Sequence, residues 1–216
     1  MGLMSWLGLG GPKRPPIPVA VVAGISGSGR KSLINKVIEA LGPGVKVCVV
    51  LYDAHAAENA IAKADNVCVN AYASSGGAQC PCHGSPATPI RDSVRKAAQT
   101  SAPDYILVQV GRGKMAREVI RDLLNLGALV KFASMTAVIN AQSGMNDLRD
   151  SEDELTSFVR AAGQTLVTQP AEGQEWALEA VRKKVAEISP KTVFLSDEAK
   201  AAANIKGQLE AAKTAA

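Results

Sequence analysis

The sequence has few aromatic residues. They make up 4% of its 216 positions, so flat side chains on which bases or sugars could stack are scarce. Neither sign of charge dominates, because 24 basic residues against 20 acidic ones leave a formal net charge of +4. The basic residues are spread along the chain, whereas proteins that bind nucleic acids concentrate them and add stacking aromatic side chains. Nucleic acid is therefore not expected as a partner.

Long apolar runs and a cysteine framework are also missing. No stretch reaches the ~20 consecutive apolar residues of a membrane-spanning helix, so no membrane span is expected. The cysteines Cys48, Cys68, Cys80 and Cys82 are too scattered for the disulfide framework of a small secreted domain. A reducing compartment is therefore expected. The cytoplasm is the simplest location, with an organelle as the alternative. Cys48 and Cys68 lie in apolar runs and are expected in the core.

The chain does have a hydrophobic content of 47%, which is enough for one domain with a sizeable core. We expect that domain to cover residues 17–196. Residues 1–16, which end in two prolines, are expected to form a flexible segment or, alternatively, a short docking peptide. Residues 197–216 are rich in alanine and predict a C-terminal helix. The sequence leaves open whether this helix packs on the domain or projects from it.

Short apolar runs alternate with longer helical patterns along the domain. The runs are rich in valine and isoleucine and are mostly uninterrupted, as in strands that are covered on both faces of a sheet. They predict strands at 17–23, 45–51, 67–70, 105–110, 135–140, 164–168 and 192–195. Helices are predicted at 32–41, 90–98, 116–126, 152–162, 174–188 and 197–212. This alternation predicts an α/β fold, with a mainly parallel sheet and helices on both faces.

The segment 23–32, AGISGSGRKS, follows the first predicted strand and opens the first predicted helix. It is close to the phosphate-binding pattern of glycine, four residues, glycine, lysine, and serine or threonine. Gly24 and Gly29 have the required spacing. Glycines in such a loop let backbone N–H groups turn towards a phosphate at the N-terminus of a helix. We therefore expect Gly24, Gly27, Ser28 and Gly29 to bind phosphate.

The last residues of this segment are out of register with the pattern. Arg30 stands where lysine is expected, and Lys31 and Ser32 come one position late. In one interpretation Arg30 neutralises the phosphate, although a planar guanidinium does not simply replace a compact ammonium group. In another, the loop is one residue longer, and Lys31 and Ser32 keep the usual roles. A glycine-rich turn that binds no ligand is the third interpretation.

A second unusual segment, SSGGAQCPCHGSPATPIRDSV at 74–94, carries Cys80, Cys82 and His83 within four positions. Two thiols and an imidazole are ligands for Zn²⁺, Ni²⁺, Co²⁺ or Cu⁺. A fourth ligand would come from elsewhere in the chain or from a second chain. The density of ligands favours a metal site, and the alternative is a surface loop whose cysteines bind nothing.

These motifs and their order resemble those of the metal-insertion P-loop GTPases represented by CobW, UreG and HypB, over residues 17–196. The stretch AGISGSGRKSLINKVI is similar to the CobW-type TGFLGAGKTTLLNHIL. Asp53 matches the switch segment of UreG. The loop at Cys80 falls where CobW relatives have Cys-x-Cys-Cys and UreG has Cys-Pro-His. The resemblance implies a P-loop domain that binds GTP and Mg²⁺, with Asp53 helping to hold Mg²⁺. It also implies a homodimer that carries a metal on the cysteine loop and delivers it to a client protein.

The chain departs from this family at several nucleotide-binding positions. Gln109 replaces the acidic residue that follows the fourth strand and would act in catalysis, and it offers no anionic oxygen to a metal-bound water. Residues 168–171, Thr-Gln-Pro-Ala, replace the Asn-Lys-x-Asp that reads guanine. Arg30 and Lys31 are the third departure. We therefore expect a GTPase-like metal carrier whose GTP hydrolysis is impaired or absent.

Two other functions remain open from the sequence. The chain could be a catalytically inactive scaffold subunit that keeps the GTPase fold within a larger assembly. The weaker alternative is an ATP-dependent small-molecule kinase, because the guanine motif is missing.

Overall fold

The structure is a computed structural model that describes residues 14–25, 27–52, 61–72, 90–111, 113–150, 152–168, 170, 172–195 and 197–215. The strands in this part of the chain are β1 (Ile17–Ala23), β2 (Val47–Tyr52), β3 (Val67–Tyr72), β4 (Tyr105–Val110), β5 (Val130–Asn140), β6 (Gln164–Thr168) and β7 (Val193–Leu195). The helices are α1 (Arg30–Leu41), α2 (Ile90–Ser101), α3 (Ala116–Leu124), α4 (Gly144–Asp150), α5 (Glu152–Ala161), α6 (Glu175–Ile188) and α7 (Glu198–Thr214).

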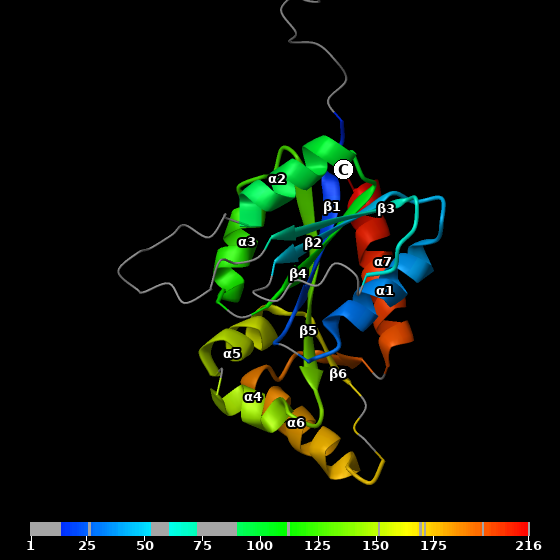
Figure 1. The fold of residues 1–216 in the computed structure, drawn as a ribbon. Helices are drawn as coiled ribbons and strands as arrows, with labels where there is room; N and C mark the ends of the chain where they lie inside the picture. The colour runs from blue at the N-terminus through cyan, green and yellow to red at the C-terminus, as the bar shows by residue number, and fades with distance from the viewer. Residues whose placement is uncertain are drawn as a thin grey trace, which may run out of the picture.

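The strands form one sheet in the order β3-β2-β4-β1-β5-β6-β7, and every neighbouring pair is parallel. β1 lies between β4 and β5, and all of its residues are buried. Burial on both faces explains the uninterrupted apolar runs of the sequence. The predicted α/β fold, with a parallel sheet covered by helices on both faces, is confirmed (Figure 1).

Two apolar clusters hold the layers together, one on each face of the sheet. On one face, side chains of α1 and α7 pack against the sheet and against each other. On the other face, the buried side chains of α2, α3, α5 and α6 form the larger cluster. Figure 1 shows α1 and α7 side by side, away from α2 and α3. Ile205 and Leu209 of α7 are fully buried, so the C-terminal helix packs on the sheet and does not project from it.

The structure differs most from the predicted elements at two places, and the ends of the other elements differ by at most three residues. β5 begins at Val130 and not near residue 135. Lys131 and Ser134 interrupt its apolar run, but pairing with β1 extends the strand. The short helix α4 was not predicted, because its seven residues include only two buried ones, Gly144 and Leu148, which is too few to show a helical pattern. None of the helices in the described part of the chain combines the length and the hydropathy of a membrane span.

Candidate functional site

The glycine loop joins the end of β1 to the start of α1, at the carboxyl edge of the sheet. Gly27 and Gly29 have φ angles of 78° and 93°, in the left-handed region that glycine adopts without a steric penalty. Gly24 is closely packed, because an added Cβ would lie 2.8 Å from Ser28 Oγ and would also collide with the carbonyl oxygen of Val138. Three of the predicted phosphate-binding glycines therefore occupy positions where a side chain is strained or excluded.

The first backbone N–H groups of α1 precede the hydrogen bonds of the helix. The first bond along the helix runs from Leu33 N to the carbonyl oxygen of Gly29, at 3.0 Å. The N–H groups of residues 30–32 precede it, and the N-cap Gly29 has no side chain to accept from them. No acidic residue lies in the first turn of α1. The loop therefore presents the partial positive charge of a helix N-terminus to an anion.

Arg30 is turned away from solvent and fastens the loop to the sheet. Its side chain is buried, and Nη1 donates to the carbonyl oxygen of Val110, the last residue of β4, at 2.7 Å. The N–H of Gly24 donates to the same oxygen at 3.2 Å. At least one nitrogen of the guanidinium is thus engaged in positioning the loop.

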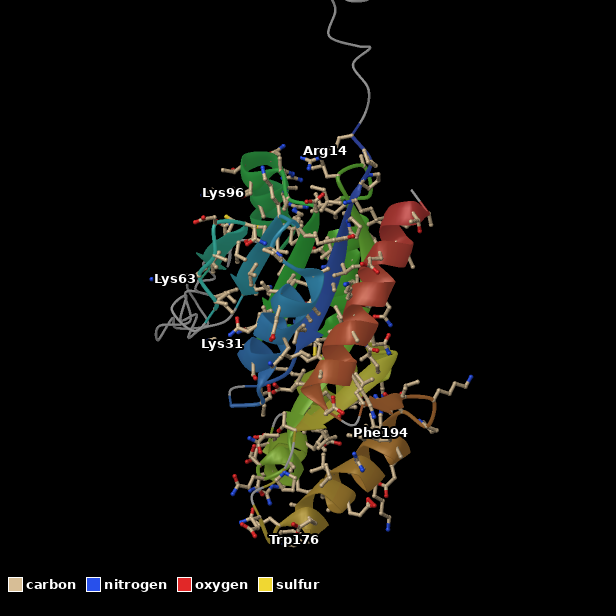
Figure 2. All side chains as sticks on the ribbon, turned by 90° about the vertical axis from the view of Figure 1, so that its right-hand side faces the viewer. Arg14, Lys31, Lys63, Lys96, Trp176 and Phe194 are labelled. Carbon is tan, nitrogen blue, oxygen red and sulfur yellow. The ribbon has the colours of Figure 1, made fainter. Side chains whose placement is uncertain are left out.

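Lys31 and Ser32, the next two candidates, have different surroundings. Ser32 Oγ donates to Glu198 Oε2 of α7 at 2.6 Å. An added Cβ on Gly29 would lie 3.7 Å from Glu198 Oε1, so this carboxylate stands beside the loop. The Lys31 side chain makes no hydrogen bond or ion pair to any residue that the structure describes. Figure 2 shows Lys31 on the side of α1 that lies away from α7.

Two buried polar side chains near the loop have no hydrogen-bond partner among the described residues. Ser28 is 1% exposed and its Oγ is unpaired, and Gln109 is fully buried with both amide atoms unpaired. Gln109 pairs in register with Val22 and Leu51, whose side chains pack on the α1 face. Its amide therefore lies beneath α1. Buried amides without partners are rare in folded proteins.

β5 and β6 also reach the loop at their carboxyl ends. Asn140 Nδ2 donates to the carbonyl oxygen of Gly27 at 3.0 Å. Thr168 Cγ2 would lie 3.0 Å from a Cβ on Gly29. Sequence reasoning missed both Asn140 and Glu198, although an asparagine that ends an apolar strand was a usable signal for the first. Thr168, the first residue of the segment that was expected to read guanine, thus lies against the glycine loop. The family pattern has an asparagine at this position.

Tyr52 ends β2 at the same sheet edge. Its hydroxyl is buried and unpaired within the described residues, and burial raises the pKa of the phenol. Lys114 Nζ lies 5.8 Å from the centre of its ring. This pair is close enough for a cation–π contact, which fixes the basic side chain above the end of β2.

The remaining predicted site residues, Asp53, Cys80, Cys82 and His83, lie outside the described residues. Asp53 directly follows β2, and the cysteine segment connects the end of β3 to α2. Because all strands are parallel, β2 and β3 end at the same sheet edge as β1.

Comparison with solved structures finds the same fold in HypB and in the YjiA GTPase. The chain is similar to the hydrogenase maturation factor HypB from Archaeoglobus fulgidus, with a TM-score of 0.56, 18% identity and 90% of each chain covered. The Zn(II)-bound YjiA GTPase from E. coli has a TM-score of 0.56 and 14% identity, over 85% of this chain and 58% of YjiA. HypB from Helicobacter pylori in complex with nickel has a TM-score of 0.55 and 12% identity, over 92% of this chain and 88% of that one.

No protein-family model matches the sequence. No curated protein matches it either. At these identities the likeness concerns the fold, and the expected resemblance is confirmed at that level. The chain has the α/β fold of the P-loop GTPases HypB and YjiA.

Proposed function

We propose that the chain is a soft-metal carrier built on a P-loop GTPase fold, with GTP hydrolysis that is impaired or absent. Its glycine loop binds nucleotide phosphates, and Cys80, Cys82 and His83 hold the metal that is carried. The glycine loop supports this proposal most strongly, because left-handed glycines lie at a helix N-terminus that has no acidic residue in its first turn. The metal-bound states of two proteins with this fold, YjiA with zinc and HypB with nickel, agree with such a cargo.

The residues of the loop suit a phosphate group. Backbone N–H groups of residues 30–32 would donate to its oxygens, and a bound phosphate would supply the negative charge that the α1 N-terminus attracts. Lys31 is the cation best suited to neutralise it, because its side chain is uncommitted within the described residues. Arg30 instead holds the carbonyl oxygen of Val110, which favours the second interpretation of the shifted motif.

The same residues suit Mg²⁺ and guanine less well. The hydroxyl of Ser32 is engaged with Glu198, and Gln109 offers no anionic oxygen for a metal-bound water. Thr168 has no amide group with which to bind a base. These three features are the reason why we propose binding of a nucleotide with weak or no hydrolysis.

The sheet topology supports placing the cargo near the nucleotide. The segment with Cys80, Cys82 and His83 starts from the end of β3, at the carboxyl edge where the glycine loop lies. Nucleotide binding would then change the affinity of the cysteine segment for the metal. A client protein, or the second subunit of a homodimer, would bind at this edge of the sheet. In this proposal residues 17–196 form the carrier domain, and the helix in 197–216 packs on its core.

Calorimetric titration with GTP or GDP, with and without Mg²⁺, tests the proposal. We expect binding by the natural chain and about tenfold weaker binding by Lys31→Met, because a charge-assisted hydrogen bond is lost. Lys36→Met is the matched control: Lys36 lies on the same helix but pairs with Glu39 at the surface. Equal affinities of the two variants would exclude Lys31 as the phosphate ligand.

A second titration, with Zn²⁺ or Ni²⁺ before and after the nucleotide, tests the cargo site. We expect the double variant Cys80→Ser, Cys82→Ser to lose the metal and keep the nucleotide. Metal content that is unchanged in this variant would remove the carrier proposal.

The second candidate function is a catalytically inactive scaffold with the GTPase fold. The contacts of Arg30 with Val110 and of Ser32 with Glu198 favour it, because both side chains are engaged within the chain. This function predicts no calorimetric signal with any nucleotide at millimolar concentration, whereas the carrier proposal requires one.

A further inference from the structure

Cys48 and Cys68 form a pair of thiols far from the glycine loop. They are register partners on the adjacent parallel strands β2 and β3, and each is the second residue of its strand. Register partners in a sheet lie ~4.8 Å apart and point to the same face. The pair is therefore near the amino edge of the sheet, at the opposite end of the strands from the glycine loop. Both are free cysteines.

Polar groups surround the two sulfur atoms within an otherwise apolar layer. Asn70 Nδ2 donates to Cys48 Sγ at 3.2 Å, and Ser101 Oγ of α2 donates to Cys68 Sγ at 3.1 Å. Such donors are unnecessary for two cysteines that serve only as small apolar core residues, and they stabilise negative charge on sulfur.

The two cysteines differ in exposure. Cys48 is fully buried, but Cys68 is half-buried on the outermost strand of the sheet (Figure 1). Cys68 and Ser101 line a pocket of about 190 Å³ together with Asn66 and Pro103. A small ion can therefore reach Cys68 from solvent and meet Cys48 behind it.

We propose that Cys48 and Cys68 form a binding site for a single soft monovalent cation, with Cu⁺ as the ion that fits best. Thiolate sulfur selects soft ions such as Cu⁺. Among the described residues no group of three or more His, Cys, Asp or Glu side chains gathers as a metal site, so the pair offers two ligands where tetrahedral Zn²⁺ takes four. This site is independent of the function proposed for the glycine loop and for Cys80.

The chemistry of binding balances without a redox partner. Two S–H bonds break, two sulfur–copper bonds form and two protons leave to solvent, while copper stays monovalent. Burial raises the pKa of the Cys48 thiol to about 12, so the ion must displace a proton there. The resulting S–Cu–S unit carries one net negative charge. The donors on Asn70 and Ser101 offset the cost of burying that charge.

Anaerobic titration with Cu⁺ against a chromophoric Cu⁺ chelator tests the site. The full chain with Cys80→Ser and Cys82→Ser serves as the background, so that Cys48 and Cys68 are the only thiols left to bind the ion. We expect one Cu⁺ per chain in this background and loss of binding on adding Cys68→Ala. Absence of binding in the background, or binding that survives Cys68→Ala, would overturn the proposal.

Ser101→Ala provides a second, milder variant that keeps both sulfurs. It removes the donor to Cys68, and we expect Cu⁺ affinity to fall by about tenfold because a hydrogen bond to a charged atom is lost. Ser93→Ala is its matched control, since Ser93 is buried on the same helix and its hydroxyl has no partner among the described residues. Equal affinities of these two variants would contradict the assigned role of Ser101.

Discussion

The change of Gly24 to alanine probes how closely the glycine loop is pressed against the sheet. The added methyl carbon would lie 2.8 Å from Ser28 Oγ and 3.4 Å from Arg30 Cδ, and closer still to the carbonyl oxygen of Val138. The serine hydroxyl can rotate away. The carbonyl oxygen cannot, because Val138 lies in β5, which is paired on both sides.

The loop itself must therefore move, and the cost is that of overpacking, about 1–3 kcal/mol of unfolding free energy. In a chain of this size the melting temperature would fall by roughly 2–12 °C. The displaced loop would also lose its bond from Gly24 N to Val110, so affinity for GDP should fall as well. Urea unfolding and calorimetry measure the two effects separately.

Two other glycines serve as controls for this substitution. Gly44→Ala adds the same methyl group in open space, and its unfolding free energy should stay within about 0.5 kcal/mol of the natural value. Gly27→Ala meets no atom but has a φ of 78°, so it should cost about 1–2 kcal/mol from backbone strain alone. If Gly24→Ala is no more harmful than Gly44→Ala, the packing described for the loop is wrong.

Three further substitutions test other contacts. Gln109→Met should raise the unfolding free energy by about 1 kcal/mol in urea, because a buried amide without partners in the described chain is replaced by an apolar group of similar size. A loss of stability would show that the amide is satisfied in solution. Glu198→Gln should tighten GDP binding by about fivefold in calorimetry, because a like charge beside the loop is removed; an unchanged affinity would place the phosphate elsewhere. Lys213 lowers the pKa of the Asp104 carboxyl, so the contribution of this pair is present above about pH 4 and is lost as the pH falls through the lowered value. Asp104→Asn should lower the unfolding free energy by about 0.5 kcal/mol at pH 7, a small amount because the pair is partly exposed. The loss should be smaller at pH 3. If the difference in unfolding free energy between Asp104→Asn and the natural chain is the same at pH 3 as at pH 7, the assigned ion pair with Lys213 is wrong.

The layers of this fold could be predicted because its strands are buried on both faces. The runs at 17–23, 105–110 and 164–168 are rich in apolar and β-branched residues, and the structure has strands with those same bounds. Only the second half of β5 could be predicted from the sequence, because the half-buried Lys131 near its beginning breaks the apolar pattern. An apolar run in the sequence indicates that a strand is buried, so it does not reveal the part of a strand that extends beyond the core.

The candidate site was less predictable, because long side chains take their direction from tertiary contacts. Sequence spacing identified the glycines, whose backbone angles are a local requirement. It could not show that Arg30 turns towards the carbonyl oxygen of Val110, 80 positions away. Nor could it show that Ser32 meets Glu198, which is 166 positions away. Contacts of this kind follow from the packing of α7 on α1, which no local motif encodes.

The helix α7 connects the glycine loop with the opposite margin of the sheet. Its first residue, Glu198, touches the start of α1, whereas Lys213 near its other end holds Asp104 at the opposite margin of the sheet. A helix of 17 residues is about 25 Å long, so this single rod joins the two margins. An anion that displaces Glu198 would break its bond with Ser32, while the buried side chains of Ile205 and Leu209 keep the helix packed on the sheet. A spectroscopic label on the first turn of α7 would therefore report anion binding at the glycine loop from a segment that lies 166 positions from Ser32 in the sequence.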